Sequence, residues 1–120
     1  MKYMIMMLGD QNTMFQVKSP EWIRNMHEFM MKTDRELRES GEVVEGWGLV
    51  DPSQAKVVRI QNGLPVATDG PYAEAKESLA GFWIVDVVDE ARAIEIASEV
   101  VAFTEEPLEV RQVADAPPEV

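Results

Sequence analysis

Runs of apolar residues, separated by polar and turn-forming residues, divide the chain into predicted strands and helices. We expect the main strands at residues 3–8, 43–49, 79–87 and 108–113, and the helices at residues 20–40 and 90–102. Two shorter strands, at residues 56–60 and 64–66, flank Asn62-Gly63, a dipeptide typical of a two-residue hairpin turn. Polar loops are predicted at residues 9–19 and 68–78, and a flexible acidic tail at residues 114–120.

Both predicted helices have capping residues and one apolar face. Ser19 and Pro20 are typical of a helix start, and Gly41 is typical of a helix end. Helical spacing on the first helix predicts a buried face made by Trp22, Met26, Phe29, Met30, Thr33 and Leu37, with Asp34 and Arg38 paired on the polar side. For the second helix, which Asp89 is expected to cap, the predicted inward residues are Ala91, Ile94, Ala97 and Val101.

The order of these elements, β-α-β-β-α-β with a hairpin extension, indicates an α+β, ferredoxin-like fold. Two helices then cover one face of an antiparallel sheet, and the other face is ordinarily polar. Here both faces are apolar, because Tyr3, Ile5 and Met7 alternate with Met4, Met6 and Leu8, and Phe82 and Ile84 alternate with Trp83 and Val85. The simplest cover for the second face is another copy of the sheet, so we expect a homodimer.

Composition adds a domain count and several exclusions. The 120 residues suffice for a single domain, predicted at residues 1–113. Because the chain has no cysteine, disulfides, thiolate metal sites and cysteine nucleophiles are excluded, and we expect no metal or other cofactor. A net charge of −11 disfavours nucleic acid and anionic membranes as partners. The chain has neither a secretory signal nor a membrane-spanning run, so the expected location is the cytoplasm.

The most informative segment runs from Thr68 to Phe82 and contains Asp69-Gly70-Pro71-Tyr72, a Glu-x-Lys-Glu stretch at residues 74–77, and Gly81 before an aromatic strand. With this segment the chain resembles the YCII-related family, in particular its DGPF branch, which is named for an Asp-Gly-Pro-Phe run. The resemblance extends over residues 1–113 through Lys2-Tyr3-Met4, Gly9-Asp10, Gly48-Leu49, Pro52, Val58-Arg59 and Glu109-Val110-Arg111. The departures are Tyr72 for phenylalanine, Ala75 for threonine and Gln112 for proline.

The resemblance implies a ferredoxin-like, dimeric α/β barrel of mostly unestablished activity. Members of this branch are often encoded beside extracytoplasmic-function sigma factors, which implies a regulatory or accessory role. The wider family is proposed to use a histidine–aspartate pair as an enzymatic site. The only histidine here is His27, and its place in the first helix does not match that of the family histidine.

The residues of the motif have both a structural and a functional interpretation. Asp69, Gly70 and Pro71 can form a rigid turn closed by the aspartate side chain, or they can present Asp69 and Tyr72 at the mouth of a pocket. Glu74, Lys76 and Glu77 form either a solvated charge cluster or a site for a cation, an amine or acid–base chemistry.

Other side chains could take part in a site or in the core. Arg59 and Arg111, on strands, pair with carboxylates or clamp an anionic ligand. His27 has three interpretations: a surface residue, a general base or an axial haem ligand. Trp47, Trp83 and the methionines, including Met4, Met6, Met7, Met26, Met30 and Met31, are predicted to pack in the core.

Three hypotheses for the function follow from the residues and the resemblance. The first is a small-molecule-binding or accessory protein that uses the barrel cavity and the 68–78 loop to bind a polar or anionic ligand. The second is an acid–base enzyme with Asp69 as base and Arg59 or Arg111 as electrostatic stabiliser. The third is a protein-interaction module that acts through its acidic surface. Because no complete catalytic constellation is visible, the residues favour the first hypothesis.

Overall fold

The computed structural model describes residues 1–72 and 77–119. The strands and helices, in chain order, are β1 (Lys2–Leu8), α1 (Gln11–Val17), α2 (Pro20–Glu39), β2 (Val43–Gly48), the short 3-10 helix η1 (Pro52–Gln54), β3 (Lys56–Gln61), β4 (Leu64–Asp69), β5 (Leu79–Asp86), α3 (Glu90–Thr104) and β6 (Leu108–Gln112).

The main sheet has four strands in the order β2-β5-β1-β6, and every neighbouring pair is antiparallel. Strands β1 and β2, which α2 connects, therefore run in the same direction, and so do β5 and β6, which α3 connects. The structure is thus a mixed α+β fold whose strand order is compatible with the expected ferredoxin-like arrangement. The strands β3 and β4 form a separate two-stranded sheet.

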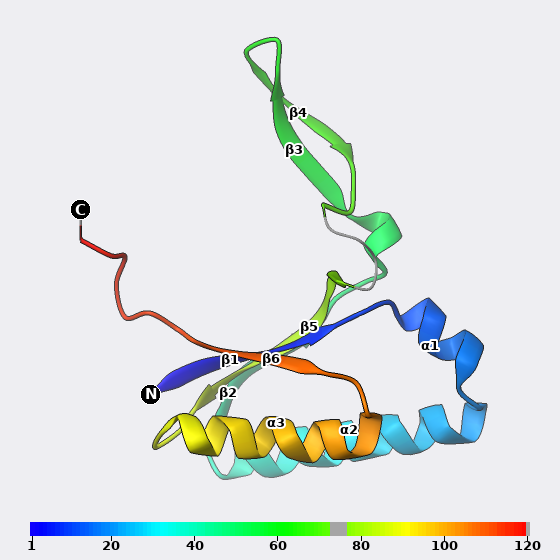
Figure 1. Cartoon of the computed structure of the whole chain (residues 1–120), viewed down its shortest axis with the longest axis vertical. Helices are drawn as coiled ribbons and strands as arrows, with labels where there is room; N and C mark the ends of the chain where they lie inside the picture. The colour runs from blue at the N-terminus through cyan, green and yellow to red at the C-terminus, as the bar shows by residue number, and fades with distance from the viewer. Residues whose placement is uncertain (73–76, 120) are drawn as a thin grey trace.

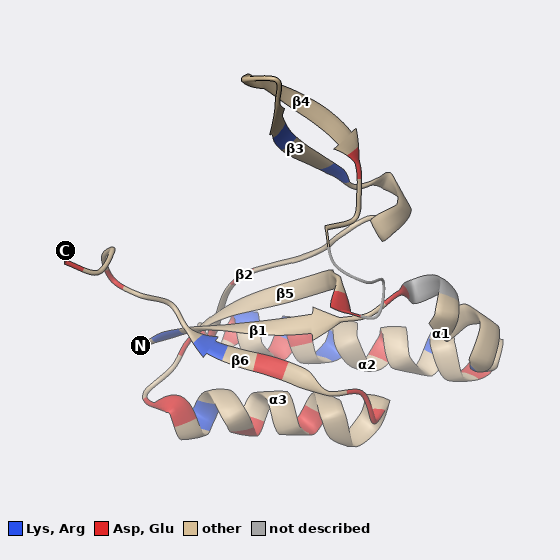
Figure 2. Ribbon diagram, turned by 45° about the horizontal axis from the view of Figure 1, so that its top comes forward, with Lys and Arg blue, Asp and Glu red and all other residues tan. Residues whose placement is uncertain are grey.

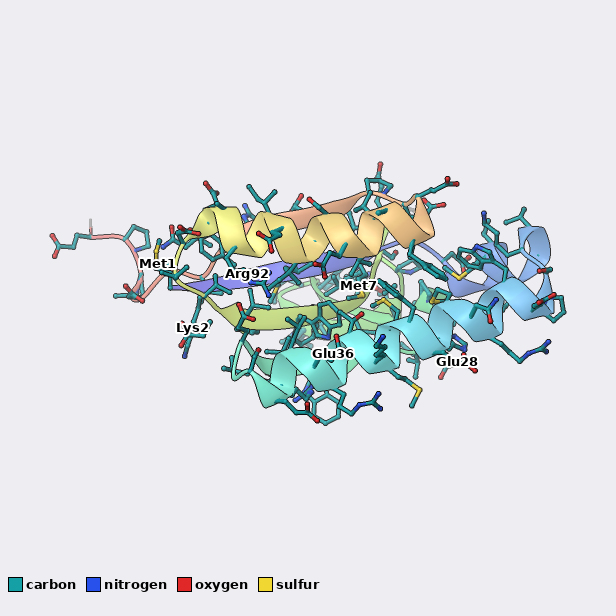
Figure 3. All side chains as sticks on the ribbon, turned by 90° about the horizontal axis from the view of Figure 1, so that it is seen from below. Met1, Lys2, Met7, Glu28, Glu36 and Arg92 are labelled. Carbon is teal, nitrogen blue, oxygen red and sulfur yellow. The ribbon has the colours of Figure 1, made fainter. Side chains whose placement is uncertain are left out.

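Helices α2 and α3 lie side by side on one face of the main sheet (Figure 3). The core lies between them and the sheet, where the strand residues Ile5 and Val85 and the helix residues Ile96 and Val100 are fully buried. Tyr3 is also buried there, and burial raises the pKa of its phenol, which the nearby carboxylates of Glu90 and Asp89 raise further. Phe29 of α2 stacks on Phe103 of α3 with ring centroids 4.7 Å apart, which joins the two helices.

On the opposite face of the main sheet, no helix among residues 1–72 and 77–119 covers the strands (Figure 1). We call it the open face; it carries Met4, Met6, Phe82 and Ile84, which are half-buried, and Trp47, which is 65% exposed. The sequence analysis predicted that both faces of the sheet are apolar, and the structure confirms it for the two central strands, β1 and β5. The edge strands add Glu45 of β2 and Glu109 and Arg111 of β6 to the open face, so its centre is apolar and its edges are charged.

The hairpin of β3 and β4 projects from the body on the side of the sheet away from the helices (Figure 1). We call it the arm. Its turn is the predicted Asn62-Gly63, with φ values of 51° and 79°, as a two-residue hairpin turn requires. Because of the arm, the radius of gyration is 16.6 Å, whereas about 14 Å is expected for a compact domain of this length.

Trp83 of β5 connects the sheet to α2. Its indole ring lies against Gly46 of β2, where a Cβ atom would collide with the ring. The indole Nε1 donates to Asp34 Oδ1 at 3.0 Å, and Arg38 Nε donates to the other oxygen of Asp34 at 2.8 Å. Arg38 Nη2 in turn donates to the carbonyl oxygen of Gly46 at 3.4 Å, so that the network closes on the same strand. The predicted pairing of Asp34 with Arg38 is confirmed.

A second polar link joins the start of β2 to α3. Arg92 donates from Nε to Glu42 Oε2 at 2.7 Å and from Nη2 to Oε1 at 2.9 Å. This hydrogen bonding lowers the pKa of the Glu42 carboxyl, and the same carboxylate raises the pKa of Arg92. Both side chains are about three-quarters buried, so this pair is better protected from solvent than a surface ion pair.

Several expectations about local structure are confirmed and others are wrong. Ser19 and Asp89 cap α2 and α3 as predicted, and Gly41 follows α2 with a φ of 82°. Part of the predicted 9–19 loop is instead the helix α1, whose apolar residues Met14, Phe15 and Val17 line a cavity at the end of the sheet. The strand β4 continues to Asp69 rather than ending at residue 66.

The inward face of α3 is rotated relative to the prediction. Its buried residues are Ala93, Ile96, Ala97, Val100 and Thr104, so only Ala97 of the four predicted residues is buried. Ile94 is half exposed and Ala91 is exposed, because apolar residues occur on more than one side of this helix and its sequence allows two stripes.

None of the helices among residues 1–72 and 77–119 combines the length and the apolar character that crossing a membrane requires.

Because Gly46 contacts Trp83, we expect alanine substitutions at two glycines of β2 to differ in their effect on stability. Gly46→Ala is expected to lower the free energy of unfolding by about 1–3 kcal/mol, because the new methyl group overlaps the indole ring. Gly48→Ala is the control: a Cβ there meets no atom within 4 Å, and the expected change is below about 0.5 kcal/mol. Urea unfolding followed by circular dichroism measures both, and equal losses would contradict this account of Gly46.

Candidate ligand cavity

A cavity of about 1150 Å³ lies at the end of the sheet where β1 ends and β5 and β6 begin. Residues of α1 and of the first three-quarters of α2 line one side, and the end of α3 lines another. Figure 1 shows α1 beyond this end of the sheet. Met7 of β1, which lines the cavity, lies between α2 and α3 in Figure 3. The cavity is therefore formed where the helical layer separates from the sheet.

Most of the cavity wall is apolar. All three tryptophans of the chain line it, as do five of its eight methionines: Trp22, Trp47, Trp83, Met7, Met14, Met26, Met30 and Met31. Methionine side chains are unbranched and flexible, so such a wall adapts to the shape of an apolar ligand. The predicted placement of these residues in the core is confirmed for Trp83 and Met26 and is wrong for Trp47 and Met31, which are 65% and 69% exposed.

Basic side chains lie together on the α1–α2 side of the cavity. Lys18, between the two helices, has its Nζ 4.8 Å from the centroid of the Trp22 ring. His27 and Arg35, both exposed, line the same side from α2. Of the three interpretations of His27, its exposure agrees with a residue at the surface. These basic groups can attract an anionic group of a ligand, and Asp10, Asp34 and Glu106 also line the cavity, so its wall carries charges of both signs.

Asp34 is a half-buried carboxylate of the cavity wall. Its two oxygens accept from Trp83 and Arg38, as described above, so its place is fixed from two sides. The sequence analysis placed Asp34 only in a surface ion pair and did not identify it as a residue of a site. The signal that could have identified it is Trp83, since a buried indole N–H requires an acceptor.

The motif around Asp69 lies at a second, smaller pocket of about 410 Å³ at the base of the arm. Pro71, Tyr72 and Glu77 line it, opposite Leu49 and Ala55. The peptide bond between Gly70 and Pro71 is cis, and Gly70 N donates to the carbonyl oxygen of Ala55 at 2.8 Å. A Cβ on Gly70 would lie 3.1 Å from Ala55, so this close approach of two backbones favours glycine.

Asp69 itself lies at the end of β4 and pairs with Lys56 across the arm, with 2.6 Å between Asp69 Oδ1 and Lys56 Nζ. Its side chain is 89% exposed, and it lines neither of the two cavities described here. The role of Asp69 as a base stays a prediction. For this role, a partner or a ligand would have to exclude water from the carboxylate and so raise its basicity.

The two candidate arginines lie on different sheets. Arg59 of β3 has its guanidinium carbon 5.7 Å from the centroid of the Tyr72 ring, so these two predicted residues are together at the base of the arm. Arg111 of β6 is opposite Met4 and exposed on the open face. The structure brings Arg59 to the motif and leaves Arg111 on the main sheet. Glu74 and Lys76 are outside the described residues.

Comparisons with known proteins give a family and one weak relative. A family model described as "YCII-related domain" matches residues 1–117. The chain is also 27% identical over 101 residues to an uncharacterized protein of Rhizobium meliloti (strain 1021), an alignment that covers 81% of this chain and 77% of that protein.

The network at the cavity wall predicts different effects for two acidic residues of α2. Asp34→Ala is expected to lower the free energy of unfolding by about 2 kcal/mol, because the indole N–H of Trp83 loses its acceptor. Glu36→Ala is the control, since Glu36 makes only a loose, exposed pair with Lys32 at 3.9 Å, and a change below about 0.5 kcal/mol is expected. Chemical denaturation measures both changes, and near-ultraviolet circular dichroism reports the environment of Trp83. An unchanged Asp34→Ala protein would contradict the network.

Proposed function

The chain belongs to the YCII-related domain family, and on that premise we propose that it is a small-molecule-binding protein whose ligand occupies the cavity at the end of the sheet. The observation that carries the proposal is the size and lining of this cavity. Sites for small organic ligands have volumes of about 300–1,000 Å³ and mostly apolar walls with a few polar groups. A cavity of about 1150 Å³ lined by three tryptophans and five methionines has this character.

The cavity lining holds both acidic and basic residues, and the basic ones support a ligand with an anionic group. Lys18, His27 and Arg35 lie on one side, where they can pair with a carboxylate, a sulfonate or a phosphate. The aromatic and methionine side chains accept an apolar body. We therefore propose that the ligand is an amphipathic organic anion. This proposal narrows the expected polar or anionic ligand to one whose larger part is apolar.

Two further proposals concern the family branch and the role. Asp69-Gly70-Pro71-Tyr72 supports assignment to the DGPF branch of the family, with Tyr72 in the aromatic position. The ligand cavity supports an accessory or regulatory role for the protein. The acid–base alternative at Asp69 has less support, because the carboxylate is exposed and paired with Lys56.

We also propose that the protein is a homodimer, in which the open faces of two copies pack together as a dimeric α/β barrel. The support is the apolar character of the open face, which exposes Met4, Met6, Phe82, Ile84 and Trp47 on the side without helices. An exposed apolar surface of this extent in an otherwise acidic chain indicates an interface. A two-fold axis lets the same surface cover itself.

The ligand proposal predicts binding of anilinonaphthalene sulfonate, a fluorescent probe with an aromatic body and one anionic group. We expect the probe to bind with a micromolar dissociation constant and to quench the tryptophans, all of which line the cavity. Met30→Trp fills the cavity and is expected to weaken binding at least tenfold. Ile94→Trp, on the outer side of α3, is the control and is expected to leave the affinity unchanged.

Two results would contradict the ligand proposal. Equal affinity of the Met30→Trp and Ile94→Trp proteins, both shown to be folded by their unfolding transitions, would place the probe elsewhere. Equal affinity for N-phenylnaphthylamine, which has the same aromatic body and no sulfonate, would remove the anionic part of the proposal.

The dimer proposal predicts that a charge on the open face dissociates the protein. Ile84→Glu is expected to raise the dissociation constant of the dimer at least a hundredfold, because a carboxylate would be buried without a partner. Val88→Glu, at a position exposed in the loop after β5, is the control and is expected to have no effect. Sedimentation equilibrium measures both, and a wild-type protein that is monomeric at every concentration would contradict the dimer.

A further inference from the structure

The arm and the open face lie on the same side of the main sheet. In Figures 1 and 2 the helices α2 and α3 are below the sheet, and the arm extends above it. A second copy seated on the open face would therefore lie beside the arm rather than across the molecule from it.

One face of the arm is wholly apolar beyond its base. In the register of the hairpin, Val58 pairs with Ala67 and Ile60 pairs with Pro65, so these four side chains share a face. Val58 and Ile60 are 69% and 70% exposed. The exposed pair of Lys56 and Asp69 closes this face at its base. A two-stranded hairpin is only marginally stable in water, so an arm of this kind gains order from a surface that covers it.

The area of the open face falls short of what a stable dimer buries. Four strands spaced about 4.8 Å apart and about six residues long give a plan area of about 400 Å², whereas a standard interface buries about 800 Å² per partner. One face of the arm, about 20 Å long and 10 Å wide, adds about 200 Å², and the strip on which the partner's arm rests adds as much again. With both arms engaged, the covered plan area about doubles, which brings the contact into the range of a standard interface.

The charge of the arm is opposite in sign to that of the whole chain. The strands β3 and β4 contain Lys56, Arg59 and Asp69, two basic residues and one acidic residue, whereas the whole chain has a net charge of −11. Asp69 pairs with Lys56 at the base of the arm, and Arg59 lies on the face opposite to Val58 and Ile60. Figure 2 shows the basic positions on β3 and the acidic position at the base of β4. With its small net positive charge and one apolar face, the arm suits the acidic body of a second copy.

We propose that the arm clasps the second copy of this chain, with Val58, Ile60, Pro65 and Ala67 packed against the partner's body beside the interface between the open faces. The proposal rests on the homodimer proposed above and adds to it: the sheet faces meet, and each arm reaches across to hold the other copy. The residues of the arm thereby become part of the same interface as those of the open face.

Neighbouring residues on opposite faces of the arm test this proposal. Ile60→Glu, on the apolar face, is expected to raise the dissociation constant of the dimer at least tenfold in sedimentation equilibrium. Gln61→Glu adds the same side chain on the other face and is expected to change it less than twofold. Both positions are exposed in the single chain, so neither substitution is expected to alter the fold of the protomer.

The outcomes separate the arm from the dimer itself. If Ile84→Glu dissociates the protein while Ile60→Glu and Gln61→Glu have equal effects, the dimer stands and the arm proposal is overturned. If the wild-type protein is monomeric throughout, both proposals are overturned. Because the chain has no cysteine, Ile60→Cys provides a single thiol. Its labelling by a maleimide is expected to slow at least tenfold above the dissociation constant, and a rate independent of concentration overturns the arm proposal.

Discussion

The rest of the structure depends on the place of one indole ring. Trp83 fits between a strand that has no side chain at Gly46 and a helix that offers the carboxylate of Asp34. The contact is both steric and polar, so it fixes the distance of α2 from the sheet and its rotation at the same time. Because α2 carries one wall of the large cavity, the same contact determines where that cavity lies and which side chains face it.

The molecule uses the two sides of its sheet differently. On one side, α2 and α3 bury a conventional core. On the other side, the apolar open face and the basic arm are exposed together (Figure 2). The proposed ligand cavity and the proposed interface are not separate, because Trp47 and Phe82 lie on the open face and also line the cavity.

The parts of the fold that sequence predicted are those with local signals. The caps at Ser19 and Asp89, the Asn62-Gly63 turn and the single stripe of α2 are each contained within a few residues. The helix α1 was missed, because a helix of seven residues is too short to be recognised from its sequence alone. The sequence analysis expected a barrel cavity beside the 68–78 loop, but the lining of the large cavity could not be predicted, since it runs from Met7 to Leu108 without a local motif.

Because both faces of β5 are apolar, the register in which β2 pairs with β5 is selected in an unusual way. In most sheets a shift by one residue exposes apolar side chains, so water enforces the correct pairing. Here Phe82 and Ile84 alternate with Trp83 and Val85, and such a shift replaces apolar residues by apolar residues. A shift of β2 would instead bring Glu45 or Trp47 opposite Trp83 in place of Gly46, which either turns a carboxylate toward the core or sets a second ring against the first. The alignment of β2 with β5 is therefore selected by the residues of β2, above all by the absent side chain that leaves room for the ring of Trp83.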